Sequence, residues 1–268
     1  MRKLGLIAGN RTFPLHLARA ARTQGYEVIA VGLREETDPS LEKEVDRLHW
    51  VSISELGSVP AFFQREGVQE LILAGQIRPE RLLVPESGFD GVIRQLVRIL
   101  PDRSGASAMK MAVRYLEAQG FRILDSSLFL KEWVPAHAGS LTRRAPTPEE
   151  QEDAQYGLEI ARRLAQMGIG QTVAVRRKAV VAVEAIEGTD AAIRRAGQAA
   201  GPGCVIVKAC EPDHDMRFDI PVIGQETLSA MSESGAGCLA VEAGRVLLFD
   251  RVHLMTEADR LGLSVVAL

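Results

Sequence analysis

The sequence predicts an α/β protein with two domains, and three features of the chain lead to this prediction. Short apolar runs alternate with amphipathic segments through the first half, a pattern typical of a mainly parallel sheet covered by helices on both faces. A stretch without clear periodicity follows, and then a second set of strands and helices. With 268 residues, 46% of them apolar, the chain can bury one large core or two modest ones.

The first half opens with a strand, a turn and a helix. Apolar residues 4–8 predict a buried strand, and Gly9 with Asn10 predicts a turn. Residues 13–24 predict a helix, since Pro14 falls in its first turn. The remaining elements are predicted in chain order as strands 28–33 and 48–52, helix 59–66, strand 70–74, helices 92–100 and 107–119, and strand 121–124. We therefore expect a Rossmann-like N-terminal domain.

A loss of regular apolar periodicity marks the predicted domain boundary. Prolines, a glycine and arginines without periodicity predict a linker at 135–148, between an N-terminal domain at 1–134 and a C-terminal α/β domain at 149–268. At the end of this stretch Thr147 can cap a helix, and Glu150 falls at the capping-box position.

The second half is also α/β. Apolar runs at 172–175 and 179–183 flank three basic residues and predict a β-hairpin. A stripe of small and apolar residues after Thr147 predicts a helix. Further strands are predicted at 204–208, 246–249 and 264–267, and further helices at 191–199, 226–234 and 256–261.

Charge and cysteine content exclude several classes of protein. The 32 Lys and Arg against 35 Asp and Glu give a formal charge of −3, so no global field favours nucleic acid or an anionic membrane. Three widely spaced cysteines with five histidines suit neither a disulfide framework nor a compact zinc site. The apolar start is too short for a signal peptide, and no run approaches the roughly 18–20 residues that span a bilayer. We expect a cytoplasmic protein that approaches any lipid from the water side.

Two glycine turns follow predicted strands. Gly9-Asn10 and the turn of Gly75 and Gln76 would both lie at carboxyl ends of parallel strands, where ligands gather. Small residues and free backbone N–H groups before a helix can receive phosphate. Neither turn is a Walker A loop or a full G-x-G-x-x-G, and ordinary turn chemistry explains each of them equally well.

A second segment combines acids, a glycine and a hydroxyl at the start of a helix. Thr189 or Asp190 could simply be the N-cap of that helix. This explanation leaves Glu184 and Glu187, on either side of the turn before Gly188, available as ligands of a metal or a hydroxyl.

The most densely charged segment is 208–219, with eight ionisable residues in twelve positions. A solvated loop is the simple interpretation. However, Asp219 leads directly into an apolar segment, and burying a carboxylate is costly without cations, a metal or hydrogen-bond donors. Lys208 and Arg217 are candidate companions. Such a group suits attack of water on phosphorus, where Asp219 could hold a metal or take a proton from water.

Along nearly its whole length the chain resembles the LpxI-type UDP-2,3-diacylglucosamine pyrophosphatases. The matching motifs are GLIAGN at 5–10, LTRRAPT at 141–147, IGQTV at 169–173, AVEAIEGTD at 182–190, and RFD at 217–219 followed by PVIG at 221–224. The last three together make the resemblance specific. Two positions depart from the pattern: the chain has Gly-Ala-Ser at 105–107, where many relatives have glycine and two aspartates, and Asn10, where they often have a second glycine. The first departure puts in doubt any contact carried over to that region.

The resemblance implies a reaction and a set of residues. Water attacks the α-phosphate of UDP-2,3-diacylglucosamine and gives UMP and 2,3-diacylglucosamine 1-phosphate (lipid X) in lipid A biosynthesis, with Mg²⁺ or another divalent cation. The essential aspartate falls on Asp219, which is also the candidate metal ligand. The implied substrate-binding positions are Gly9, Asn10, Gln76, Gln171, Glu187, Gly188, Thr189, Asp190, Lys208 and Arg217.

The implied partner is the UDP-diacylglucosamine lipid, without nucleic acid and with at most peripheral membrane contact, at the inner face of the inner membrane. The sequence leaves a homodimer, the acyl-chain length and the identity of the metal open. The alternative function is a non-catalytic module that binds a nucleotide sugar or an acyl lipid. A nicotinamide-dependent oxidoreductase is disfavoured because no full dinucleotide fingerprint follows the first strand.

Overall fold

The computed structural model describes residues 2–75, 77, 90–101, 105–211, 214–217 and 220–268, with only the backbone described at 105 and 106. The chain divides into two compact units. The first runs to Leu130 and takes in a short return segment that begins at Asp215. The second comprises Lys131–His214 and Ile220–Leu268. The stretch predicted as a linker therefore lies in the second unit.

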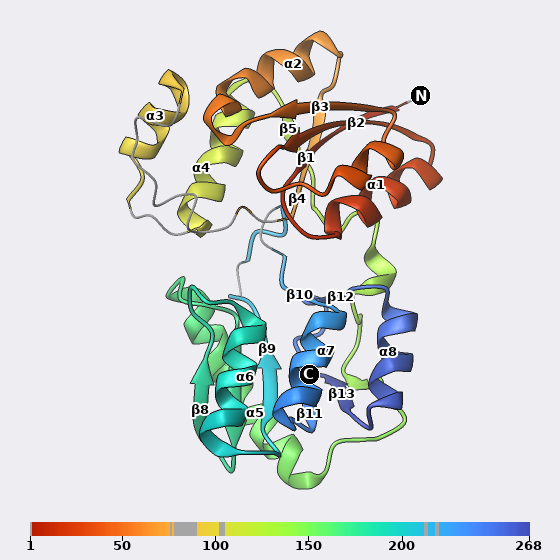
Figure 1. Ribbon diagram of the computed structural model, residues 1–268, viewed down its shortest axis with the longest axis vertical. Helices are drawn as coiled ribbons and strands as arrows, with labels where there is room; N and C mark the ends of the chain where they lie inside the picture. Colours follow the sequence, from red (N-terminus) through yellow and green to blue (C-terminus); the bar gives the residue numbers. More distant parts are fainter. Residues whose placement is uncertain (1, 76, 78–89, 102–104, 212–213, 218–219) are drawn as a thin grey trace. The chain divides into compact units, whose positions relative to one another are not determined.

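Among its described residues, the first unit contains a five-stranded sheet in the order β3-β2-β1-β4-β5 (Figure 1). The strands are β1 (Arg2–Ala8), β2 (Tyr26–Leu33), β3 (Arg47–Val51), β4 (Glu70–Ala74) and β5 (Arg122–Ile123). Every pair is parallel. Because the chain proceeds from β1 toward one edge and returns to place β4 on the other side of β1, the carboxyl ends of β1 and β4 form a topological switch point.

Helices cover both faces of this sheet. They are α1 (Phe13–Thr23), α2 (Val59–Arg65), α3 (Gly91–Arg98) and α4 (Gly105–Ala118), with 3-10 turns η1 (Pro39–Lys43) and η2 (Ile53–Ser58). Phe63 of α2 and Leu116 of α4 pack with Ile29 and Val31 of β2 in one core cluster. Side chains alternate along a strand, so Val28 and Ala30 are buried on the opposite face, where α1 packs against β2. This architecture confirms the predicted Rossmann-like fold class.

The second unit has a mixed sheet of six described strands in the order β6-β13-β11-β9-β7-β8. They are β6 (Gly139–Ser140), β7 (Thr172–Arg176), β8 (Ala179–Val183), β9 (Val205–Lys208), β11 (Cys238–Val241) and β13 (Ser264–Ala267). The central strands β9, β11 and β13 are parallel, whereas β6, β7 and β8 pair antiparallel. A separate parallel pair is formed by β10 (Val222–Ile223) and β12 (Leu247–Leu248).

Helices also cover both faces of the second sheet. They are α5 (Pro148–Gln166), α6 (Thr189–Ala200), α7 (Gln225–Ser234) and α8 (Arg251–Arg260), after a 3-10 turn η5 (Lys131–Trp133). Helix α5 packs on one face through Leu158 and Ala161, and α6, α7 and α8 pack on the other. Gly157 lets α5 approach closely, because a Cβ there would lie 2.6 Å from Val207.

Two local predictions are confirmed in this unit. Thr147 and Glu150 form the reciprocal capping box at the start of α5. The hairpin of β7 and β8 turns through Arg177 and Lys178, whose φ angles are 51° and 57°. Both residues donate their N–H groups to the buried carboxylate of Asp153, at 2.7 and 2.6 Å. A side chain from α5 thus stabilises a left-handed turn made without glycine.

Among the described residues, no helix has the length and apolar character needed to cross a membrane.

Candidate functional site

The two predicted glycine turns of the first unit lie against each other at the switch point. Gly9 donates its N–H to the carbonyl of Ala74 at 2.8 Å. Gly75 adopts φ +81°, and a Cβ there would lie 2.5 Å from the carbonyl oxygen of Asn10. Close contact and a left-handed backbone both require glycine at position 75. Gln76, predicted to contact substrate, lies outside the described residues.

Side chains fix the first of these turns. Thr37 donates its hydroxyl to the carbonyl of Ala8 at 2.6 Å and accepts the N–H of Leu33 at 2.8 Å. Asn10 extends its amide toward Glu36, with 3.4 Å between Nδ2 and Oε2. Thr12 occupies the N-cap of α1 but makes no side-chain cap hydrogen bond. Thr12 thus leaves the start of α1 without a cap from its own side chain, which suits an anion-binding position.

The second unit holds a buried polar cluster at the ends of β7, β8 and β9. Lys208 is 4% exposed, and its Nζ donates to Thr189 Oγ1 at 2.7 Å and Thr172 Oγ1 at 3.2 Å. Glu184 Oε2 lies 3.7 Å from the same nitrogen. Thr189 donates its hydroxyl to Glu184 Oε1 at 2.9 Å, and the backbone N–H of Gln171 donates to Oε2 at 3.2 Å. We call these five residues the Lys208 cluster.

The Lys208 cluster keeps its carboxylate ionised. Burial is the largest single influence and raises the pKa of Glu184, but the charge of Lys208 and hydrogen bonds from Thr172, Thr189 and Gln171 together lower that pKa below its ordinary value. The cluster is therefore a buried ion pair whose charges offset each other.

The start of α6 adjoins this cluster. Gly188 is the N-cap with φ 83°, and no side chain caps the helix. Asp190 instead accepts the Thr227 hydroxyl of α7 at 2.9 Å, and Glu187 pairs with Arg195 at 2.5 Å. The simple capping role considered for Thr189 or Asp190 is wrong, since neither caps α6. The N-cap of α6 thus gives its first-turn N–H groups no side-chain acceptor.

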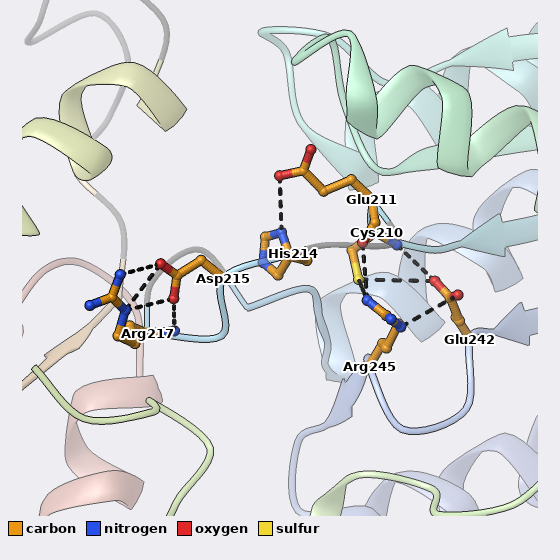
Figure 2. A network of polar contacts seen from close by, with 7 residues as sticks. All are labelled: Cys210, Glu211, His214, Asp215, Arg217, Glu242 and Arg245. Atoms are coloured by element: carbon orange, nitrogen blue, oxygen red, sulfur yellow. Dashed lines mark hydrogen bonds and ion pairs between the residues drawn. The ribbon is translucent and has the colours of Figure 1, made fainter.

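A second buried network holds the exit from β9. Glu242 is 5% exposed and accepts the backbone N–H of Cys210 at 3.1 Å, while Arg162 approaches its Oε1 at 2.7 Å. Arg245 lies 3.7 Å from the same carboxylate and donates to the carbonyl of Glu211 at 3.0 Å (Figure 2). Burial raises the pKa of the Cys210 thiol to about 11. This network anchors the first residues of the charged segment predicted at 208–219.

Arg217 belongs to the first unit. Its guanidinium donates to Asp215 through Nε at 2.8 Å and through NH2 at 2.6 Å, as Figure 2 shows, and it pairs with Glu117 of α4 at 2.5 Å. The hydrogen bonds that Arg217 donates to Asp215 are the main reason that the pKa of Arg217 is raised. The carbonyl of Arg217 lies 2.8 Å from the buried Ser126 hydroxyl. Asp219, the predicted catalytic residue and metal ligand, lies outside the described residues.

The structure brings some predicted positions together and separates others. Gln171, Thr189 and Lys208 meet in the Lys208 cluster, with Gly188 next in sequence. Glu187 and Asp190 have partners outside it. Thr172 and Glu242 were not predicted. Thr172 opens an apolar run, where a lone hydroxyl gives little signal, and Glu242 follows a strand that was itself not predicted.

The described side chains do not by themselves provide a metal site. No group of three or more His, Cys, Asp or Glu gathers within the described ranges. Glu184 uses both carboxylate oxygens for hydrogen bonds inside the protein. The described donor set therefore does not fit a divalent cation.

Comparison with known proteins gives matches over both halves of the chain. The family model described as LpxI N-terminal domain matches residues 3–133, and the model described as LpxI C-terminal domain matches residues 137–266. A curated relative from Caulobacter vibrioides (strain ATCC 19089 / CIP 103742 / CB 15), named UDP-2,3-diacylglucosamine pyrophosphatase LpxI, is 34% identical over 276 residues, covering 99% of this chain and 97% of the relative.

Two solved structures match the chain at low identity. CobK precorrin-6A reductase is 12% identical with a TM-score of 0.33, covering 100% of this chain and 87% of its own. Glycinamide-RNase-transformylase T from Mycobacterium tuberculosis is 18% identical with a TM-score of 0.25, covering 52% of this chain and 38% of its own. Scores this low support no inference about function.

Proposed function

The chain belongs to the LpxI family, and from that premise we propose that it hydrolyses UDP-2,3-diacylglucosamine at the α-phosphate, giving UMP and 2,3-diacylglucosamine 1-phosphate in lipid A synthesis. The observation that carries the proposal is the relative named for pyrophosphatase activity on this substrate, which aligns with 99% of the chain.

The first unit and the second each offer an anion-binding feature that suits such a substrate. A diphosphate repels an incoming nucleophile, so an enzyme must offset its charge with positive groups or oriented dipoles. The start of α6 presents first-turn N–H groups beside Gly188 without a side-chain cap. The start of α1 follows the paired glycine turns in the same way. We assign phosphate contacts to the start of α6, and further substrate contacts to Gly9 and Asn10.

Asp219 is the proposed essential carboxylate. Its assignment comes from the resemblance of RFD at 217–219, followed by PVIG, to the family pattern. Its role is to take a proton from the attacking water or to hold a divalent cation. The magnesium requirement is a proposal that rests on the resemblance.

One assay tests substrate, metal and aspartate together. Purified protein is incubated with UDP-2,3-diacylglucosamine and magnesium, with and without EDTA, and released UMP is measured. We expect release by the wild type, loss of release with EDTA, and a fall of about 100-fold or more in Asp219→Asn with binding retained. Asp259→Asn is the matched control, since Asp259 accepts the backbone N–H of Arg143 outside both proposed anion sites.

Two results would contradict the proposal. Saturable binding by the wild type without UMP release favours a non-catalytic binding module. Full activity of Asp219→Asn would show that Asp219 is not the essential carboxylate. Peripheral contact with a bilayer and a homodimeric assembly remain predictions, which vesicle co-sedimentation and light scattering would check.

A further inference from the structure

Lys208 is poorly placed to bind a phosphate directly. Its side chain is 5% exposed, and two of the three N–H groups of its ammonium are used by the hydroxyls of Thr189 and Thr172. Glu184 lies 3.7 Å from the same nitrogen. An ammonium has three donors and no acceptor, so little of its hydrogen-bonding capacity remains for a ligand.

We propose that Glu184 and Lys208 are positioning residues, which act on the substrate through Thr189 and the start of α6, and that the ammonium of Lys208 is not itself a phosphate ligand. This inference rests on the proposed function, because it states how the phosphate-binding end of α6 is held.

Thr189 links the ion pair to the helix. Its hydroxyl donates to Glu184 at 2.9 Å and accepts from Lys208 at 2.7 Å, so the pair fixes both of its hydrogen-bonding roles. Thr189 is also the first residue of α6. It follows the N-cap Gly188, which has no side chain to cap the helix. Fixing the Thr189 side chain therefore fixes the direction in which the first-turn N–H groups of α6 point.

The same contacts tie several elements at one point. Thr172 begins β7, Glu184 follows β8, and Lys208 ends β9. Gln171 donates its N–H to the second oxygen of Glu184. A shift in the pair would thus move the start of α6 relative to three strand ends.

Charge balance gives a sharp test. Removing either partner leaves the other charge buried and unpaired, which disturbs the structure strongly, whereas replacing both removes the imbalance. If the pair acts by position, a neutral pair restores much of what a single substitution loses. If Lys208 acts by contact with phosphate, removing its ammonium is not repaired by a change at Glu184.

The experiment measures kcat and KM for UMP release in Glu184→Gln, Lys208→Met and the double variant. Because a displacement of about 1 Å can cost about 100-fold in rate, we expect each single variant to lose about tenfold or more in kcat/KM. The double variant should recover about tenfold or more relative to Lys208→Met. Glu150→Gln is the control: Glu150 is an ion-paired carboxylate of the same unit, with a side chain 17% exposed against 14% for Glu184, and should keep wild-type activity.

The inference is overturned if the double variant stays as inactive as Lys208→Met, or if Glu184→Gln keeps its kcat/KM or lowers its KM. Thermal unfolding of each variant shows which are folded. Should Lys208→Met fail to fold, Glu184→Gln alone decides.

A second readout separates this inference from the proposed function. If the wild type releases no UMP, the proposed function fails, and the positioning role is then judged by calorimetric binding of UDP. Binding weaker by about tenfold in Glu184→Gln, but unchanged in Glu150→Gln, supports the role. Equal binding by both variants, or no binding by the wild type, overturns it.

Discussion

Replacing Glu242 with alanine should loosen the exit from β9. Glu242 is 5% exposed and accepts the backbone N–H of Cys210 at 3.1 Å. Cys210 is fully buried, so the substitution would take from this N–H its acceptor among the described residues. Since Cys210 lies two residues after Lys208, the same change should lower UMP release.

The expected cost follows from the two shorter contacts of the Glu242 carboxylate, with the Cys210 N–H and with Arg162. Leaving a buried N–H without an acceptor costs about 1–3 kcal/mol. Arg162 is 40% exposed, so its ion pair contributes only about 0–1 kcal/mol. We expect Glu242→Ala to destabilise the second unit by about 1–4 kcal/mol. Glu242→Gln keeps an oxygen for the Cys210 N–H and should cost less than about 1.5 kcal/mol.

Urea unfolding measures this difference in one unit at a time. The chain has two tryptophans, Trp50 in the first unit and Trp133 in the second, so a Trp50→Phe background reports the second unit alone. Trp133 packs against Phe249, with ring centroids 5.1 Å apart, and should respond to unfolding.

Alkylation of Cys210 provides the second measurement. Burial raises the pKa of its thiol to about 11, so the wild type should resist iodoacetamide at pH 8. Both variants remove the charge of Glu242, and the difference between them isolates local opening. A cost of about 2 kcal/mol corresponds to labelling about 30-fold faster in Glu242→Ala. Equal stability and equal labelling in the two variants would refute the assigned anchoring.

Three further predictions concern other parts of the chain. Gly75→Ala should destabilise the first unit by about 2–4 kcal/mol, because it adds a Cβ 2.5 Å from the Asn10 carbonyl to the strain of a positive φ. Gly120→Ala, with φ +91° and nothing within 4 Å, should cost only about 1 kcal/mol, and Trp50 fluorescence in a Trp133→Phe background measures both. Asp153→Ala removes the acceptor of two hairpin N–H groups and should lower the unfolding free energy of the second unit by about 2–4 kcal/mol, a result that an unchanged urea midpoint would exclude. The pKa of Glu184 is lower in the folded protein than its ordinary 4.5, so the ionised carboxylate contributes to stability above pH 4.5, and this contribution is lost as pH falls through the folded pKa. The difference in unfolding free energy between wild type and Glu184→Gln should therefore shrink in acid. A difference that stays constant from pH 7 to strongly acidic pH would contradict the shift.

The sequence predicted most of the fold because local signals and long-range packing agree in this chain. The strand at 70–74 coincides with β4, and the capping box at Thr147 marks the start of α5. The largest omission is β11 (Cys238–Val241), a central strand of the second sheet. Its four residues follow a glycine-containing turn and are at the lower limit of length for an apolar run that signals a strand. Only pairing with β9 and β13 on both sides makes so short a run a strand.

The candidate site was less predictable, because its partners come from distant parts of the chain. Residues 208–219 read as one charged group, yet Lys208 is paired with residues 19 to 36 positions away. Arg217, nine positions later, belongs to the other unit and is paired with Glu117. Ionisable residues of one charged segment thus belong to two different units. Sequence spacing identified the residue types that phosphate chemistry needs, but only burial distinguishes a lysine held inside an ion pair from one that is free to meet a ligand.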